Sequence, residues 1–305
     1  MVVEHAVGPA EKLPPRRGRV LDLSYARPEQ SWFRRTLIRL VERASGKSKL
    51  ERIYANWLAQ PRDPQEPIFS AAIRMLHITP VVVAGSLTGI PRSGPVLVLA
   101  NHPFGIIDGL LVGHLVALVR PDMKLMVHSL LCQPEEARDV VLPVDFGETE
   151  AARRTSLETR RQAAEWLDAG HVLIVFPAGS ASTADKPLAE HATDAAWHPF
   201  AVRLAARKGV RTVMMFVHGQ NSRLFQIASH LSYPLRVALI LRETAKRVGT
   251  RVRVAVGPAL TVADLPVGQD RAGTAQAFRE MCYGLAGADG PDPAQVFVWP
   301  RYIRW

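Results

Sequence analysis

His102 and Asp108 lie six positions apart, in a segment that begins at Asn101 directly after the strand-like apolar run 95–100. A histidine held by a carboxylate is the smallest side-chain device that can take a proton from a hydroxyl near neutral pH. Another apolar run, residues 110–119, follows the aspartate almost at once. The pair therefore indicates acid–base chemistry beside an apolar environment, which points to a lipid as the substrate.

The spacing of the two residues requires a turn between them. On one straight helix, positions six apart would differ by about 120° in azimuth, and fully extended they would be separated by about 20 Å. Pro103 restricts His102 to extended geometry, and Gly105 can adopt positive φ without penalty. The sequence thus predicts a bend that brings the two side chains together. The alternative is an ordinary strand-to-helix loop that His102 merely caps.

Two later segments add to this pattern. Residues 171–180 form a buried-type strand that ends in Phe-Pro-Ala-Gly-Ser, and residues 219–225 read Gly-Gln-Asn-Ser-Arg-Leu-Phe. With the first segment, they resemble the glycerolipid (PlsC-like) acyltransferase superfamily. The resemblance covers about residues 87–258 and is greatest to the hemolysin-like branch, in which Asn-His-Pro-x-Gly-x-x-Asp-Gly and Phe-Pro-Ala-Gly replace the more widespread motifs.

The resemblance implies an acyl transfer from a thioester to a lipid precursor. His102 would be the general base and Asp108 would orient its imidazole. The positions that would contact substrate are Asn101, Gly105, Phe176, Pro177, Gly179, Ser180 and Asn221. Leu110, Leu111 and Leu115 could line an apolar slot for the acyl chain, although ordinary core packing is the favoured interpretation of these three.

This chain departs from the superfamily at two polar positions. The motif glutamate is replaced by Ala178 and the motif arginine by Ala181. Ser180, Ser182, Thr183, Asp185 and Lys186 are the polar residues nearby in the sequence. Either the acceptor differs from glycerol 3-phosphate, or neighbouring basic residues take over its recognition.

Composition excludes several other classes of protein. Cys132 and Cys282 are the only cysteines in 305 residues, too few for a disulfide scaffold or a zinc site. Neither a His-Glu-x-x-His segment nor a glycine-rich phosphate loop occurs. We therefore expect no metal and no cofactor, with acyl-CoA or acyl carrier protein serving as the acyl donor.

The net charge of +10 predicts anionic partners. Residues 32–41 mix bulky apolar side chains with arginines at helical spacing, which favours a helix lying on an anionic membrane surface; a helix packed on the protein body is the alternative. Residues 1–19 lack the apolar core of a secretory signal, and the longest apolar run is too short to span a bilayer. We expect a cytoplasmic protein, peripheral on the inner face of the membrane, that binds lysolipid and no nucleic acid.

Apolar strands alternate with helices along the chain, which predicts an α/β fold with a mixed, partly parallel sheet. We expect a disordered arm at residues 1–30, a helical and possibly membrane-associating region at 31–80, an acyltransferase domain at 81–260 and a tail at 261–305. Strands are expected at 81–83, 95–100, 124–128, 142–145, 172–176, 213–217 and 252–256. Helices are expected at 31–44, 50–59, 69–76, 109–119 and 149–169, and in the middle of 261–290.

Two other functions stay open from the sequence alone. One is a catalytically silent lipid-binding protein of the same fold, for which Ala178 and Ala181 are arguments. The other is a basic protein that binds nucleic acid.

Overall fold

The computed structural model describes residues 32, 35–36, 46–61, 63–128, 134–144, 149–288 and 290–300. The predictions for the arm at 1–30 and for most of the helix at 31–44 lie outside these residues.

A seven-stranded sheet forms the centre of the described chain, in the order β1-β9-β8-β2-β5-β3-β4. The strands are β1 (Thr79–Ala84), β2 (Val96–Ala100), β3 (Met123–His128), β4 (Val141–Val144), β5 (Val172–Val175), β8 (Arg211–Val217) and β9 (Arg251–Leu260). All neighbouring pairs are parallel except β8 and β9. The predicted mixed, partly parallel α/β sheet is confirmed, and β4 lies at its edge.

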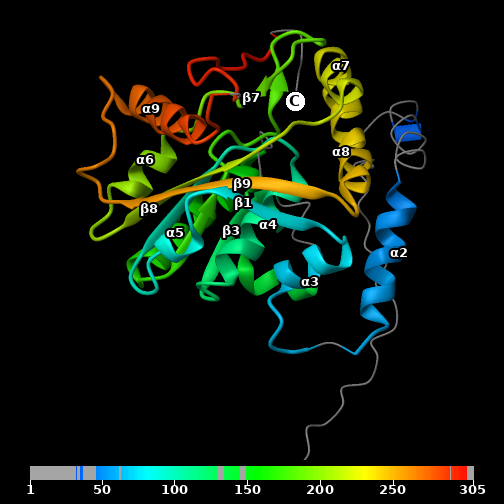
Figure 1. Ribbon diagram of the computed structural model, residues 1–305, viewed down its shortest axis with the longest axis horizontal. Coiled ribbons are helices and arrows are strands. Elements are labelled where there is room, and N and C mark those ends of the chain that lie inside the picture. The colour runs from blue at the N-terminus through cyan, green and yellow to red at the C-terminus, as the bar shows by residue number, and fades with distance from the viewer. Residues whose placement is uncertain are drawn as a thin grey trace, which may run out of the picture.

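Helices accompany the sheet (Figure 1). They are α2 (Lys47–Leu58), α3 (Ile68–Met75), α4 (Ile106–Ala117), α5 (Glu150–Asp168), α6 (Phe200–Ala205), α7 (Arg223–Leu231), α8 (Tyr233–Arg247) and α9 (Arg271–Gly284). Short 3₁₀ helices cover Leu87–Gly89 and Glu135–Val140, and a small antiparallel pair joins β6 (Thr183–Ala184) to β7 (Ala192–Thr193). Helices α6, α7 and α8 and this small pair are not among the elements expected from the sequence.

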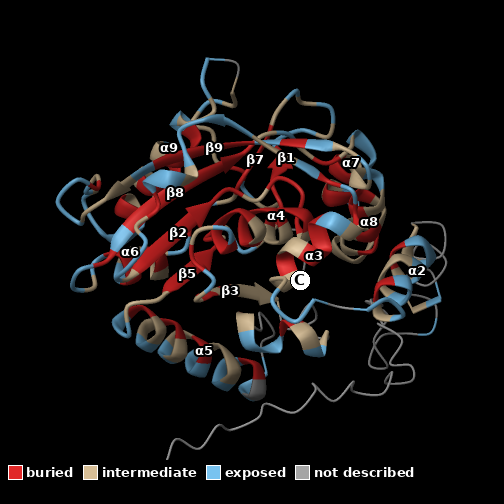
Figure 2. Ribbon diagram, turned by 60° about the horizontal axis from the view of Figure 1, so that its bottom comes forward, coloured by how far each residue is buried: buried red, intermediate tan, exposed pale blue. Residues whose placement is uncertain are grey.

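Strand β2 is buried along its whole length because helices cover both faces of the sheet (Figure 2). Successive side chains of a strand point to opposite faces. Val98 accordingly packs in the core shared with α3 and α4, whereas Leu97 and Leu99 pack in a second core shared with α5, α6 and α9. The result is three layers, helix–sheet–helix, which explains why this strand reads as a continuous apolar run.

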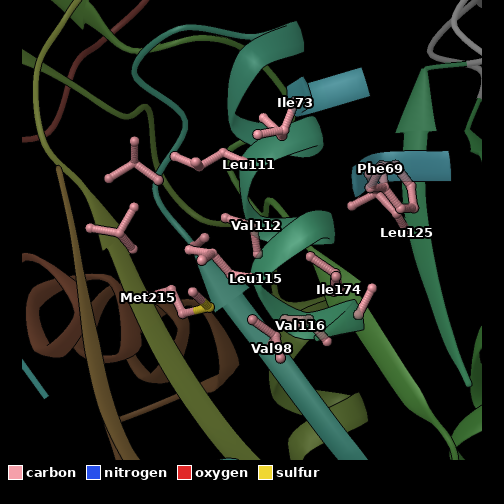
Figure 3. Close-up of a cluster of buried hydrophobic side chains, with 14 of the residues drawn as sticks. Phe69, Ile73, Val98, Leu111, Val112, Leu115, Val116, Leu125, Ile174 and Met215 are labelled. Carbon is pink, nitrogen blue, oxygen red and sulfur yellow. The ribbon is translucent and has the colours of Figure 1, made fainter. Parts of the chain in front are cut away.

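Helix α4 is apolar almost all round because it is buried between the sheet and α3. Its Val112, Leu115 and Val116 face the sheet near Val98 (Figure 3). Gly113 permits the close approach of α3, since a Cβ there would lie 2.7 Å from the ring of Phe69. The helix that carries Asp108 is therefore fixed rigidly against the centre of the sheet.

Candidate active site

The candidate site lies beyond the carboxyl ends of three neighbouring parallel strands, β8, β2 and β5. Asn101 and His102 follow β2, and Phe176 follows β5. The strands that follow β2 in the chain, β3, β4 and β5, all lie on one side of it in the sheet. The next strand of the sheet, β8, lies on the other side of β2. The direction in which successive strands are added therefore reverses beside β2. Ligands of open α/β sheets bind in the crevice outside such a point.

The predicted contact between the histidine and the aspartate is present. Nδ1 of His102 lies 3.0 Å from Oδ2 of Asp108. The same oxygen accepts hydrogen bonds from the backbone N–H groups of Phe104 and Gly105, both at 2.8 Å. Gly105 has a φ of 87° at the start of α4, a conformation that glycine adopts readily. The bend predicted from the spacing is therefore confirmed, and its backbone wraps around the carboxylate.

The environment of Asp108 suits a carboxylate that stabilises a cation. The side chain is completely buried in the first turn of α4, where the helix dipole favours negative charge. Burial raises the pKa of the Asp108 carboxyl, while His102 and the N–H groups of Phe104 and Gly105 act in the opposite direction. A positive charge on the imidazole would stabilise the ionised carboxylate, and the carboxylate would in turn stabilise the imidazolium.

His102 is the member of the pair that a substrate can reach. Its side chain is 19% exposed, whereas that of Asp108 is 0% exposed. The imidazole stacks on the ring of Phe176, with centroids 4.5 Å apart and planes inclined by 30°. Because Nδ1 faces Asp108, Nε2 is the nitrogen left to exchange a proton with a substrate. The phenyl ring and the carboxylate together restrict the rotation of the imidazole.

A second buried carboxylate, Asp194, holds the backbone around the site. Its Oδ1 accepts hydrogen bonds from the His102 backbone N–H at 3.2 Å and from the Ser182 hydroxyl at 2.6 Å. Its Oδ2 accepts from the indole of Trp197 at 2.9 Å, and its own backbone N–H donates to the Tyr283 hydroxyl at 2.7 Å. Asp194 was not predicted from the sequence, because no local motif surrounds it and His102, whose backbone it holds, lies 92 positions away in the chain.

His102 opens onto a cavity of about 990 Å³. This volume lies at the upper end of the range for ligand pockets, about 300–1,000 Å³. Its walls come from α2, α3, the start of α4, β3, residues 175–181, residues 196–201 and α8. Most of the lining is apolar, and the aliphatic and aromatic side chains beyond His102 include Leu50, Ile53, Ile68, Phe69, Leu110 and Leu125. A long hydrocarbon chain fits this environment better than a polar ligand does.

Comparison with known proteins identifies the family. A protein-family profile described as "Acyltransferase" matches residues 31–283, which is most of the chain. The chain belongs to this acyltransferase family. Among solved structures, a 1-acyl-sn-glycerophosphate (LPA) acyltransferase, PlsC, from Thermotoga maritima is similar over 83% of this chain and 95% of its own, with 16% identity and a TM-score of 0.46. A search of curated proteins finds no match.

The acyltransferase brings most of the predicted substrate-contact residues to the cavity. Besides His102, the predicted residues that line it are Gly105, Phe176, Pro177, Gly179 and Ser180. Of the three leucines that could line an acyl slot, only Leu110 lines the cavity. Leu111 and Leu115 instead lie in the main hydrophobic core of the acyltransferase, as the interpretation of ordinary core packing predicts, because they are on the face of α4 turned toward the interior.

Two predicted residues, Asn101 and Asn221, do not line the cavity. The amide of Asn101 donates to the Val217 carbonyl at 2.9 Å and accepts from the Val217 N–H at 2.7 Å, which extends the pairing of β2 and β8 beyond the strand ends. The Asn221 amide lies 3.4 Å from the Phe104 carbonyl oxygen. In the acyltransferase both side chains position the backbone around His102.

The polar residues near the replaced motif positions have structural partners of their own. The Ser182 hydroxyl donates to Asp194, and Oγ1 of Thr183 accepts from Arg236 at 2.6 Å. Oδ2 of Asp185 accepts from Gln295 at 2.7 Å. Of the polar candidates from the sequence, Ser180 lines the cavity of the acyltransferase.

Within the described ranges, no group of three or more histidine, cysteine or acidic side chains is arranged to bind a metal ion. None of the helices in those ranges has the length and apolarity needed to cross a bilayer.

Proposed function

We propose that this acyltransferase moves a fatty acyl group from an acyl thioester, either acyl-CoA or acyl carrier protein, to a hydroxyl of a glycerolipid or lysolipid acceptor. The observation that carries the proposal is the His102–Asp108 contact of 3.0 Å, with the histidine on the wall of a large apolar cavity.

The reaction follows from the position of the imidazole. Nε2 of His102 accepts the proton of the acceptor hydroxyl while the oxygen attacks the thioester carbonyl carbon. Asp108 holds the ring in place and stabilises the imidazolium. When the tetrahedral intermediate collapses, the carbon–sulfur bond breaks and the thiolate takes the proton from His102. The products are the ester and the free thiol, and the histidine returns to its starting state.

The apolar cavity supplies the affinity for the fatty chain. Each methylene group that leaves water contributes about 0.8 kcal/mol. The cavity continues from His102 to α2, α3 and β3, so the chain would extend away from the reacting carbonyl along these elements. Binding energy from the chain would thereby position the thioester against the base.

We further propose that the enzyme works on the inner membrane surface as a peripheral cytoplasmic protein. The support is the net charge of +10, which favours an anionic lipid surface, and the apolar character of the cavity. An acceptor lipid would then reach His102 from the bilayer.

The test is the rate of thiol release from acyl-CoA in the presence of lysolipid acceptors, with the acylated lipid identified by mass spectrometry. His102→Ala should lower the rate by about 10²- to 10⁴-fold, the usual contribution of a general base, and should leave the melting temperature close to that of the wild type. His191→Ala, a half-buried loop histidine outside the cavity lining, is the matched control and should keep its activity.

Two results would contradict the proposal. One is turnover by His102→Ala at the wild-type rate. The other is tight binding of acyl-CoA by the wild type without any transfer to the acceptors, which would favour a catalytically silent lipid-binding protein.

A further inference from the structure

Arg236 of α8 is a buried arginine that lines the same cavity as His102. Its side chain is 3% exposed. Nη1 donates to the hydroxyls of Thr183 and Ser229, both at 2.6 Å, and Nη2 donates to the Ala181 carbonyl. The guanidinium also lies over two aromatic rings, 4.6 Å from the centroid of Phe225 and 4.9 Å from that of Trp299. These contacts fix the position of the group on the cavity wall.

Among the described residues, no negatively charged group neutralises the positive charge of Arg236. Its hydrogen-bond acceptors are two hydroxyls and a carbonyl, and no carboxylate in the described part of the chain forms an ion pair with it. A guanidinium has five N–H groups, so two of them have no acceptor among the described residues. Burial lowers the pKa of Arg236 to about 9, which still leaves the group charged near neutral pH. A buried charge without a counter-ion is costly, and an anionic ligand would remove this cost.

The location of the guanidinium relates directly to the departure noted in the sequence. The motif arginine of the superfamily is replaced by Ala181, and the carbonyl of this residue accepts a hydrogen bond from Arg236. The next residue, Ser182, donates its backbone N–H to the His102 carbonyl at 2.7 Å. Arg236 thus reaches from α8 to the loop from which the motif side chain is absent, one residue from a direct contact with the catalytic segment.

We infer that Arg236 binds an anionic group, a phosphate or a carboxylate, on the acyl acceptor. This inference rests on the proposed function, because it requires the acceptor hydroxyl to lie at His102. The donor fits less well, since the phosphates of acyl-CoA are separated from the thioester by the long pantetheine arm. An acceptor that carries both a hydroxyl and an anionic group could contact His102 and Arg236 together, because the two residues line one cavity.

The experiment compares matched acceptors with and without the anionic group. One pair is lysophosphatidic acid and the monoacylglycerol with the same chain; the other is an N-(3-hydroxyacyl) amino acid and its methyl ester. The wild type should prefer the anionic member of one pair by about 10- to 100-fold in kcat/KM, the range for a hydrogen bond to a charged group. The pair in which the wild type prefers the anionic member shows whether Arg236 binds a phosphate or a carboxylate.

Arg236→Gln should abolish this preference, mainly through a higher KM for the anionic acceptor, with little change for the neutral one. Arg236→Lys, which keeps the positive charge, should retain part of the preference for the anionic acceptor. Arg223→Gln removes an exposed arginine from the neighbouring helix α7 and should leave the preference intact. A merely structural role for Arg236 would instead lower the rates with both members of a pair alike.

The outcomes separate this inference from the proposed function. Equal kcat/KM values of the wild type for both members of each pair would overturn it even if no Arg236 variant folds. An unchanged preference for the anionic acceptor in folded Arg236→Gln would also overturn the inference. The proposed acyl transfer would be unaffected by that result. If the wild type transfers no acyl group, the proposed function fails. Calorimetric binding of lysophosphatidic acid, weakened at least tenfold by Arg236→Gln, would then still support an anion site at this residue, and unweakened binding would exclude it.

Discussion

The carboxylate of Asp194 lies 3.2 Å from the backbone nitrogen of His102, although the two residues are 92 positions apart in the chain. Asp194 thus orients the backbone of His102, while Asp108 lies against its ring. The hydrogen bond from Ser182 to Asp194 connects the same carboxylate to the loop after β5. Two buried acids therefore determine the position of one imidazole, and each can be tested separately.

Asp194→Asn should lower kcat about tenfold with little change in the KM for acyl-CoA. The amide keeps the size of the side chain but replaces one acceptor oxygen by a donor, so one of the three hydrogen bonds becomes unfavourable and the free energy of unfolding should fall by about 1–3 kcal/mol. Steady-state kinetics well below the melting temperature, together with urea unfolding, measure the two effects. A loss of stability with an unchanged kcat would show that Asp194 has no role in positioning His102.

Asp108→Asn should reduce kcat by about 10²- to 10⁴-fold, because the amide cannot stabilise the imidazolium as a carboxylate does. The KM for both substrates should change little, since Asp108 is buried behind His102 and does not line the cavity. Initial rates over a range of acyl-CoA and acceptor concentrations separate the two constants. A kcat close to that of the wild type would argue against a His102–Asp108 pair in the reaction.

Gly105→Ala should destabilise the protein and impair activity. A Cβ at this position would lie 3.2 Å from Cδ1 of Ile240, and the φ of 87° is unfavourable for alanine, with a cost of about 1–3 kcal/mol. Gly249→Ala is the control, because Gly249 has a similar φ of 79° with no atom within 4 Å of a Cβ. Thermal unfolding should show a loss for both variants, and only Gly105→Ala should also lose acyl transfer. If Gly105→Ala and Gly249→Ala lost acyl-transfer activity equally, the loss in Gly105→Ala would not depend on the turn beside Asp108.

Asp122 should contribute stability that depends on pH. Hydrogen bonds from Arg120, and then from His171, lower its pKa to about 2, against the opposing effect of burial. A carboxyl whose pKa is lower in the folded state stabilises the protein above its unfolded pKa of about 3.9, and this contribution disappears as the pH falls toward 2. Because the side chain is one-third exposed, we expect about 1 kcal/mol after allowance for solvent screening. The difference in unfolding free energy between the wild type and Asp122→Asn should be present at pH 7 and smaller at pH 3; a constant difference would contradict this assignment.

Vesicles of anionic lipid should sediment the protein, and neutral vesicles should do so much less, because the chain carries a net charge of +10. Raising the salt from 0.05 M to about 0.5 M should release much of the bound protein, since the screening length then shortens to a few ångströms. Co-sedimentation at each salt concentration gives the comparison. Binding to DNA with a steep salt dependence, and no binding to vesicles, would favour the nucleic-acid function instead.

Which parts of the site were predictable depends on how far apart the interacting residues lie in the chain. His102 and Asp108 belong to a single turn, and the identities of Pro103 and Gly105 were enough to predict that the turn would close. Strand β2 was also predictable, because its continuous apolar run is typical of a strand that is buried on both faces of a sheet. Helices α7 and α8 were missed, because they follow each other directly and Pro234 interrupts the apparent pattern just where α8 begins.

The sequence by itself determined the local features: the His102–Asp108 pair, the glycine at its turn, and the strands that bring the motif segments to one end of a sheet. The tertiary structure alone decided that Asp194 lies beneath His102, that Arg236 approaches Ala181 from α8, and that Leu111 and Leu115 face the core while Leu110 lines the cavity. These relationships depend on the order of the strands and on how helices pack across them. No local spacing encodes that order, because residues far apart in the chain meet only after the sheet and its covering helices have assembled.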